Sequence, residues 1–362
     1  MEYGVVLEGA TRLKVPKGGG IKKSEEVFYN PHMMLNRDIT VALCRLLEPE
    51  TFLDAMAGSG SRGIRVANES KAKVTVNDRN PKAARLIEEN ARLNGVDVEA
   101  TMSDVRQING RYDFVDLDPF GPPVAYIDSA LDAVRHNGVL GVCATDTSAL
   151  CGSYPKACER KYDSHPLRCD CFSEVGLRIL LGFVARAALR HERGIEPLFC
   201  HSTRHYMRVQ ARLDGGHART QKGLGFLQYC FKCMWRGYRS LGDLEEECGC
   251  GGRLNTAGPL WTGRFADPAL CEKISKELLD GQFQSKAEAL KLVGLVSFEQ
   301  DLPLPHYDLH KLCRLQGCQA PSMESFFGRV QAEGFSIVRT HFNDTGFRSD
   351  MPVGALVEAL KE

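Results

Sequence analysis

The stretch Thr51-Phe-Leu-Asp54-Ala-Met-Ala-Gly58-Ser-Gly60-Ser-Arg62-Gly63-Ile-Arg65 decides the fold. It predicts a short apolar strand, then a glycine loop, then a helix over about 62–70. The loop has the spacing Gly-x-Gly-x-x-Gly, which lets a backbone approach a ligand closely and turn into a helix. This spacing is weak evidence when it stands alone, because several classes of nucleotide-binding enzyme carry it.

The segments on both sides of this loop predict a doubly wound parallel sheet, and therefore an α/β fold. A second strand, 73–77, ends at Asp78, and the helix over 81–94 closes at Asn94-Gly95. A third strand, 96–101, leads to Ser103-Asp104. The other elements expected in this sheet domain are helices over about 31–47, 125–134 and 174–190, and strands near 114–117, 138–144 and 205–213.

The fourth strand runs into Asp118-Pro119-Phe120-Gly121-Pro122-Pro123, where prolines stop any regular element. Ligands bind at this carboxyl edge in open α/β sheets. Asp118 can accept a hydrogen bond or a proton, and Phe120 can stack on a planar substrate. The combination suits methyl transfer to an amino nitrogen of a nucleobase; the alternative is an ordinary surface turn.

The order of the loop, the acids and Asp-Pro-Phe favours S-adenosylmethionine over a nicotinamide cofactor. S-adenosylmethionine has no pyrophosphate and needs an acid for its ribose and a side chain for its adenine amine. Asp78, at a strand end, and Asp104, after the third strand, are the candidates. Asp104 has the alternative role of a helix N-cap. A dehydrogenase stays open, and it would bind NAD instead.

The composition is that of a globular protein of 362 residues, long enough for two domains, with zero net charge. Residues 201–240 carry eight Lys/Arg against the single acid Asp214, and they also hold several aromatic residues. Residues 11–23 are basic as well, so both stretches are candidate nucleic-acid surfaces. No signal peptide or membrane-spanning segment is evident, which predicts a cytoplasmic protein without a membrane partner.

Four of the fourteen cysteines form two close pairs, Cys230-x2-Cys233 and Cys248-x-Cys250. This is the spacing of a structural zinc knuckle or ribbon, in which four thiolates leave no open position for catalysis. The pairs Cys169/Cys171 and Cys313/Cys318 are predicted to be buried free thiols.

The predicted organisation has three parts. Residues 1–23 form a basic, extended arm or loop, 24–225 the sheet domain, and 226–362 a smaller α+β region. Within this last part, 226–262 hold the zinc site. Residues 263–362 are mostly helical, with helices near 267–280, 285–296, 306–316 and 322–333 and a strand at 335–341. Helices followed by a hairpin resemble winged nucleic-acid modules; a dimerisation unit is an equal alternative.

Taken together, several stretches resemble the tRNA (guanine-26-N2)-dimethyltransferases of archaea and eukaryotes. The matching stretches are Glu26-Val-Phe-Tyr-Asn-Pro31, Asn36-Arg37-Asp38, Asp54–Gly63, Asp116–Gly121, Thr145–Ser148, Cys151–Cys158, Glu174–Ile179, the four-cysteine cluster and Arg339–Phe342. The resemblance implies a class I (Rossmann-like) methyltransferase domain with a zinc-bearing, tRNA-binding C-terminal region. It implies methyl transfer to N2 of guanosine 26, giving N2-methyl- and N2,N2-dimethylguanosine.

The resemblance also assigns roles to individual residues. The cofactor-binding residues are Arg37, Asp54, Gly58, Gly60, Arg62, Asp78 for the ribose, and Asp104 with Val105 for the adenine; the catalytic-pocket residues are Asp118, Phe120 and Phe28. Tyr29 is an alternative to Phe28 as the second stacking aromatic. The tRNA is expected to bind through its phosphates to 11–23, 201–240 and the C-terminal region. No obligatory protein partner is evident.

Three other functions remain open at this stage: an amino-methyltransferase of another RNA or of DNA, the dehydrogenase, and a non-catalytic tRNA-binding protein. The sequence does not decide between one and two methyl groups, nor the oligomeric state.

Overall fold

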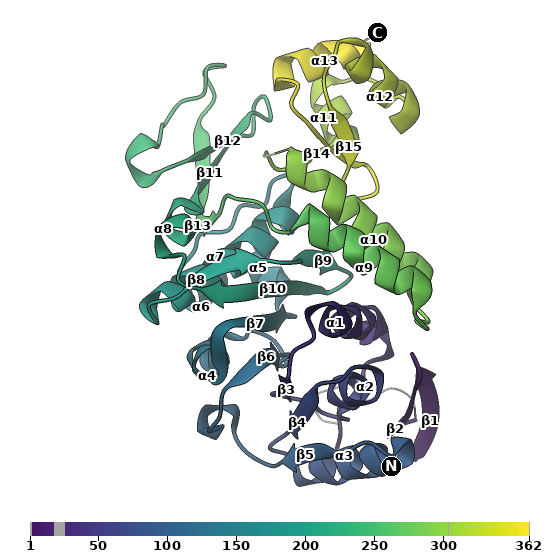
Figure 1. Ribbon diagram of the computed structural model, residues 1–362. Coiled ribbons are helices and arrows are strands. Elements are labelled where there is room, and N and C mark those ends of the chain that lie inside the picture. Colours follow the sequence, from purple (N-terminus) through teal and green to yellow (C-terminus); the bar gives the residue numbers. More distant parts are fainter. Residues whose placement is uncertain (1, 18–25, 303, 362) are drawn as a thin grey trace. The chain divides into compact units, whose positions relative to one another are not determined.

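The computed structural model describes residues 2–17, 26–302 and 304–361, and these form two compact units (Figure 1). Unit 1 comprises 1–144, 210–215 and 269–294, and unit 2 comprises 145–209, 216–268 and 295–362. These boundaries differ from the predicted break at 225/226. Helices from late in the chain belong to unit 1, where Arg45 pairs with Glu277 at 3.0 Å and Ser285 N–H donates to Asp38 at 3.0 Å.

The sheet of unit 1 has the predicted doubly wound topology. Its strands are β3 (Thr51–Asp54), β4 (Lys73–Asn77), β5 (Val98–Thr101), β6 (Tyr112–Leu117) and β7 (Val134–Ala144). They pair in parallel in the order β5-β4-β3-β6-β7. The strand next to β7 is β10 (Tyr206–Asp214), of which 210–214 belong to unit 1. The order reverses between β3 and β6, which is where ligands bind in such sheets.

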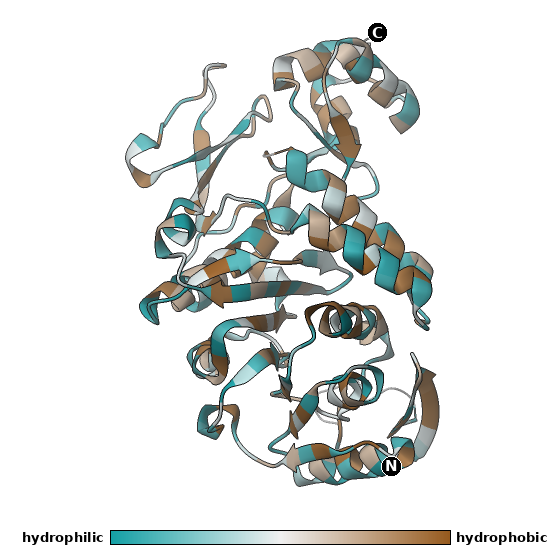
Figure 2. Ribbon diagram, in the orientation of Figure 1, coloured by the Kyte–Doolittle hydropathy of each residue, from teal (hydrophilic) through white to brown (hydrophobic). Residues whose placement is uncertain are grey.

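Helices flank these strands close to the predicted positions: η1 (Pro31–Met33), α1 (Met34–Leu47), α2 (Ser61–Glu69), α3 (Pro81–Asn94), η3 (Val124–Tyr126) and α4 (Ile127–Ala133), with α9 (Pro268–Asp280) and α10 (Lys286–Phe298) from later in the chain. Helix α3 shows why its limits could be predicted. The side chain of Asn80 accepts from Lys82 N–H, Pro81 starts the helix, and Gly95 ends it at φ 64°. Figure 2 shows the hydrophobic residues concentrated in α1 and β7.

Strand β7 begins earlier than predicted, at Val134 instead of Gly138. Polar residues 135–137 hid its start, and Asn137 has a left-handed φ of 60°. The register between β6 and β7 shifts between Tyr112 and Phe114, so a bulge absorbs the irregular residues.

The amino-terminal residues form a hairpin in place of the expected extended arm or loop. Strands β1 (Tyr3–Glu8) and β2 (Thr11–Pro16) pair antiparallel, with Glu8 opposite Thr11. The N–H groups of Arg12 and Lys14 donate to Asn94 and Asn90 of α3, at 2.9 and 2.6 Å. Part of this basic stretch is therefore fastened to unit 1; Lys22 and Lys23 lie outside the described residues.

Unit 2 is built around the long, buried helix α7 (Phe172–Arg190). Its other elements are α5 (Thr147–Leu150), α6 (Pro155–Tyr162), β8 (Gly194–Pro197), β9 (His201–Thr203), α8 (His217–Lys222), β11 (Leu224–Cys230), β12 (Arg236–Arg239), η4 (Leu241–Asp243), β13 (Leu254–Trp261), η5 (Glu299–Asp301), β14 (Tyr307–Asp308), α11 (Leu309–Gln316), α12 (Met323–Ala332), β15 (Ile337–Arg339), β16 (Gly346–Ser349) and α13 (Val353–Lys361). Helix α6 and strand β16 are not among the elements expected from the sequence.

Two small antiparallel sheets belong to unit 2, in the orders β12-β11-β13 and β14-β16-β15. The segment β14-α11-α12-β15-β16 has the helix-helix-hairpin order of the expected winged module, and the dimerisation alternative stays open. Within the described part of the chain, no helix is long and apolar enough to cross a membrane.

Candidate active site

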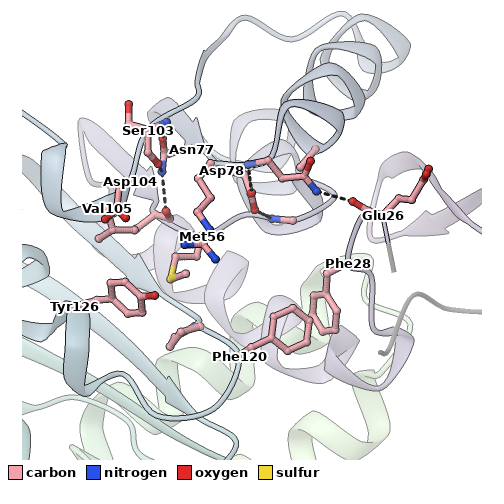
Figure 3. A pocket seen from close by; sticks show the side chains of 16 residues that line it. Glu26, Phe28, Met56, Asn77, Asp78, Ser103, Asp104, Val105, Phe120 and Tyr126 are labelled. Atoms are coloured by element: carbon pink, nitrogen blue, oxygen red, sulfur yellow. Dashed lines mark hydrogen bonds between the residues drawn. The ribbon is translucent and has the colours of Figure 1, made fainter. Parts of the chain in front are cut away.

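A pocket of about 310 Å³ lies at the carboxyl ends of the parallel strands in unit 1. It is lined by Glu26, Phe28, Ala55, Met56, Gly58, Asn77, Asp78, Arg79, Asn80, Ala83, Ser103, Asp104, Val105, Pro119, Phe120 and Tyr126 (Figure 3). A neighbouring cavity of about 40 Å³ contains Phe28 in its wall as well, together with Arg37, Asp54, Arg62 and Asp118. The two spaces together hold most of the predicted site residues.

The glycine loop needs each of its three glycines for a different reason. Gly58 has φ 55°, and a Cβ there would lie 2.8 Å from the carbonyl oxygen of Phe28. Gly60 has φ 76° and packs against Ile87, and a Cβ on Gly63 would meet the adjacent strand β4. The loop therefore keeps a bare backbone at the pocket wall.

Asp78 joins this loop to the end of β4. Its carboxylate accepts the N–H of Gly58 at 2.7 Å and the N–H of Asn80 at 2.8 Å (Figure 3). Burial raises the pKa of Asp78 above its ordinary value, against these two hydrogen bonds, which favour the charged form. The acid expected to bind a ribose thus faces the pocket in a defined orientation.

Asp104 has the capping role considered from the sequence and also lies in the pocket wall. It lines the pocket, and its side chain also caps the short helix η2 (Val105–Gln107) by accepting the N–H of Arg106 at 3.0 Å. The Arg106 side chain lowers the pKa of Asp104 well below its usual range. Val105, Met56 and Tyr126 make this end of the pocket apolar (Figure 3).

Phe28 and Phe120 form an aromatic pair at the other end of the pocket. Their ring centroids are 4.3 Å apart and their planes make an angle of 69° (Figure 3). The Phe120 side chain is 48% exposed, so a second ring could still cover it. Tyr29 is buried instead, donating its hydroxyl to Glu8 at 2.8 Å, which leaves Phe28 as the aromatic that faces Phe120.

Arg62 is the centre of the charged part of the site. Its guanidinium lies 2.5 Å from Asp118 Oδ2 and 3.1 Å from Asp116 Oδ1, and it also donates to Asn36 and Thr40. Burial by itself lowers the pKa of Arg62, but the two carboxylates outweigh it and raise the pKa. Asp118 Oδ1 has no partner among the described residues and remains able to accept a hydrogen bond.

Arg37, the other predicted arginine, is engaged by Glu8 of the amino-terminal hairpin. The two side chains form a buried ion pair at 2.5 Å, and Arg37 also donates to the carbonyl of Asn30 at 3.2 Å. Arg37 and Arg62 thus line the same small cavity, and each is held by a different carboxylate.

Sequence reasoning missed Glu8, Asp116 and Asn77 as parts of this site. Asp116 precedes Asp118 by two residues, and the two-residue period of a strand could have placed both on one face. Asn77 donates from its amide to the carbonyls of Ala55 and Ser103, at 2.9 and 3.0 Å, and so ties three strand ends together. Glu8 stands in no motif, so nothing in the sequence placed it in this site.

Asp54 is buried next to Arg62 and accepts the N–H of Gly63 at 2.9 Å, so it supports the loop from below. Burial raises the pKa of Asp54 to about 7. The nearby Arg62 lowers this pKa, and the negative charge of Asp116 raises it. An unfolded aspartic acid releases its proton near pH 4, whereas this one holds it to about pH 7. The folded state therefore binds the extra proton between these values, and its stability falls as pH rises through them.

Asp54→Asn tests this assignment, because asparagine can still accept from Gly63 but does not titrate. Between about pH 5 and pH 7 we expect the wild-type free energy of unfolding to fall by about 2 kcal/mol more than that of the variant. Urea denaturation of both proteins at these two values measures the difference. Parallel pH dependences would show that Asp54 is charged throughout.

The four predicted zinc ligands meet in unit 2. The thiols of Cys230, Cys233, Cys248 and Cys250 all lie within 4.8 Å of one another. Cys230 and Cys250 have Sγ atoms 3.6 Å apart, and Cys233 and Cys248 3.7 Å. A tetrahedral zinc site with Zn–S bonds of about 2.3 Å needs sulfurs separated by about 3.8 Å. The donor set therefore fits such an ion.

Gly252 adds a second observation on this cluster, because a Cβ there would lie 2.8 Å from the Sγ of Cys230 and 3.3 Å from that of Cys250. The chain thus leaves room around the thiols. Cys169 and Cys171, predicted as buried free thiols, are buried with Sγ atoms 3.3 Å apart. Cys313 is a buried free thiol, whereas Cys318 is partly exposed.

A doubly wound sheet with this pocket defines a class I, Rossmann-like methyltransferase fold. The chain belongs to the N2,N2-dimethylguanosine tRNA methyltransferase family, whose model matches residues 9–361. A tRNA (guanine(26)-N(2))-dimethyltransferase of Methanosarcina barkeri is 39% identical over 388 residues, covering 100% of this chain and 99% of that protein. The enzyme of the same name from Methanothermobacter thermautotrophicus is 37% identical and covers 98% of each chain.

The solved structure of Trm1 from Pyrococcus horikoshii in complex with S-adenosyl-L-methionine superposes on this chain with a TM-score of 0.90. It is 33% identical and covers 99% of this chain and 100% of its own. The predicted fold class and family are therefore confirmed.

Proposed function

We propose that this protein transfers methyl groups from S-adenosylmethionine to the exocyclic N2 of guanosine 26 in tRNA. The family and the full-length likeness to guanine-26 dimethyltransferases support the reaction and its substrate. The observation that carries the proposal is local: a carboxylate, Asp118, held by Arg62 beside the aromatic pair Phe28 and Phe120.

The pocket fits S-adenosylmethionine by the chemistry of its walls. Asp78 suits a ribose diol, while Asp104 and Val105, with Tyr126, suit an adenine ring and its amine. Arg37 and Arg62, in the smaller cavity, suit the carboxylate of the amino-acid end. When bound, the cofactor supplies an electrophilic methyl group on a sulfonium.

The chain's own residues prepare the guanine. An amine inside a paired, stacked base is out of reach, so the nucleotide must leave the stack and enter the pocket. The half-exposed ring of Phe120 then stacks on the base, and Phe28 packs beside it. Phe28 lines both cavities, which puts the stacked base next to Asp118.

Asp118 supplies the acid–base function. The guanine N2 lone pair is delocalised into the ring, and an N2–H hydrogen bond to Asp118 Oδ1 localises it on nitrogen. As the carbon–nitrogen bond forms, the methyl–sulfur bond breaks and its electron pair stays on the departing thioether, while the proton passes from N2 to this carboxylate. Arg62 holds the other oxygen, Oδ2, and so orients the carboxylate for this transfer.

The contribution of aromatic stacking to catalysis can be measured by removing the Phe120 ring. Stacking of one base on an aromatic side chain contributes about 1–3 kcal/mol. We expect Phe120→Ala to lower kcat/KM for tRNA by about 5- to 150-fold while the affinity for S-adenosylmethionine stays close to that of the wild type. Steady-state kinetics and cofactor titration measure both. Phe120→Tyr keeps the ring and serves as the matched control; equal losses in both variants would argue against stacking.

The reaction is tested by transfer of labelled methyl to unmodified tRNA transcripts that carry guanosine or adenosine at position 26. Label that depends on guanosine 26 supports both the reaction and the position, and nucleoside analysis counts the methyl groups. Label that ignores the replacement keeps the methyltransferase and rejects the position. Cofactor binding without label favours a non-catalytic tRNA-binding protein.

In unit 2 we propose that Cys230, Cys233, Cys248 and Cys250 hold a structural Zn²⁺, and that residues 226–362 contribute to tRNA binding. The cluster geometry and the absence of an open ligand position support the first statement. A cytoplasmic location and the lack of an obligatory protein partner remain predictions.

A further inference from the structure

Unit 2 contains a second cavity, which the reaction does not use. It is an open groove of about 460 Å³ lined by Arg168, Cys169, Asp170, Tyr229, Phe231, Met234, Lys311, Arg314 and Leu315. We call it the basic groove. Its walls come from the segment before α7, the cysteine loop after β11 and helix α11.

Three basic side chains line this groove, Arg168, Lys311 and Arg314, and none of them has a carboxylate partner among the described residues. Arg168 donates to Ser153 Oγ at 2.9 Å, and Lys311 lies over the ring of Phe172. The one acid in the wall, Asp170, is buried. Arg236 neutralises it by donating hydrogen bonds to its two carboxylate oxygens, at 2.9 and 3.0 Å. Three uncompensated cations around one cavity attract an anion.

The groove also presents an exposed aromatic ring. Phe231 is 48% exposed, and it is held edge-on by the buried Tyr229 with ring centroids 4.9 Å apart. Leu315, 41% exposed, adds an apolar surface on α11. A rigid, half-exposed ring among cations is the arrangement that holds single-stranded nucleic acid: phosphates on the cations, a base on the ring.

The cysteine cluster explains why the ring is rigid. Phe231 lies between Cys230 and Cys233 in a tight loop. This loop is closed by Met234 N–H donating to the carbonyl of Cys230 at 2.8 Å and Cys230 N–H donating to the carbonyl of Trp235 at 2.9 Å. The loop therefore gives the aromatic platform its position.

Two other candidate RNA surfaces in unit 2 are weaker. In the basic stretch 201–240, two of the eight basic residues, Arg208 and Arg236, are buried, as are Tyr206 and Tyr229. Helix α12, in the segment with winged-module order, carries Glu324 together with Arg329 and ends at Glu333. The exposed ring of the stretch 201–240 is Phe231, which belongs to the basic groove itself.

We propose that the basic groove binds an unpaired nucleotide of the RNA substrate, with its base on Phe231 and its flanking phosphates on Arg168, Lys311 and Arg314. The proposal rests on the proposed function only for the identity of the RNA as a tRNA. It assigns to this groove a contact with RNA away from the reacting base.

The test uses the full chain with its metal and an unmodified tRNA transcript, with equilibrium binding measured over a range of salt concentrations. We expect Phe231→Ala to weaken binding by about 5- to 150-fold. We expect the double variant Lys311→Ala/Arg314→Ala to weaken binding and to reduce the salt slope by about 1.4–1.8. The affinity for S-adenosylmethionine should stay unchanged in both.

Two controls match these variants. Phe231→Tyr keeps the ring, and Lys71→Ala/Lys73→Ala removes two exposed cations outside the stretches proposed to bind tRNA. We expect tRNA binding by the controls to match that of the wild type. Thermal unfolding checks that every variant is folded. Groove variants that bind tRNA like the wild type, or controls that lose as much as the groove variants, would overturn the proposal.

The methyl-transfer assay separates this proposal from the proposed function. If the wild type methylates guanosine 26 and the groove variants bind tRNA normally, the groove assignment fails and the function stands. If the wild type transfers no methyl group but the groove variants still lose tRNA, the function fails and the groove stands.

Discussion

Asp118→Asn should lower kcat for methyl transfer by about 10²- to 10⁴-fold, the usual range for losing a general base. The amide has nearly the same shape, so the pocket and the aromatic pair should persist, but it cannot take the proton from guanine N2. Single-turnover transfer of labelled methyl to tRNA with saturating cofactor measures the step directly.

The binding steps provide the control for this variant. We expect Asp118→Asn to bind tRNA and S-adenosylmethionine within a few-fold of the wild type, because Asp116 still pairs with Arg62. Asp97→Asn, an exposed acid outside the pocket, should keep full turnover. Full turnover in Asp118→Asn, with both ligands bound, would remove Asp118 from the mechanism.

Removal of the Zn²⁺ proposed for the cysteine cluster should destabilise unit 2 by more than about 4 kcal/mol, because the loss of a structural metal is among the most costly single changes. Four uncoordinated thiols, which lie within 4.8 Å of one another, would no longer hold the two loops together. Cys250→Ser should behave like chelation. Calorimetry and metal analysis of the purified protein measure both effects.

Cys318→Ser is the matched control, since Cys318 is also partly exposed but lies outside the cluster. We expect it to keep the metal and the wild-type melting temperature. Cofactor binding should survive chelation, because its residues belong to unit 1. A Cys250→Ser protein with undiminished metal and stability would show that the cluster is four reduced thiols.

Helix α3 and the four-cysteine cluster illustrate what local sequence could predict. Asn80, Pro81 and Gly95 specify both ends of a helix through contacts within a few residues, and the cysteine spacing specifies two tight loops. The glycine loop and the strand ends at Asp78 and Asp118 were placed for the same reason. Each depends on backbone chemistry that neighbouring residues supply.

The amino-terminal hairpin shows the opposite case. Its basic residues and its glycines suggested an extended arm, yet β2 is held by Asn90 and Asn94 of α3, about eighty positions later in the chain. Strand β7 was misjudged at its start because pairing with β6, and not its own polar residues, decides where it begins.

The sequence alone determined the doubly wound fold, the family, the glycine loop, the strand-end acids and the four cysteines, because local backbone chemistry and order along the chain encode all of these. Only the tertiary structure decided how the charges are shared. The ion pairs of Arg62 with Asp116 and Asp118, the ion pair of Arg37 with Glu8, and the groove that Arg168, Lys311 and Arg314 line together with Phe231 all join residues that are distant in sequence. Electrostatic partners depend on distance and burial in space, which no spacing along the chain specifies.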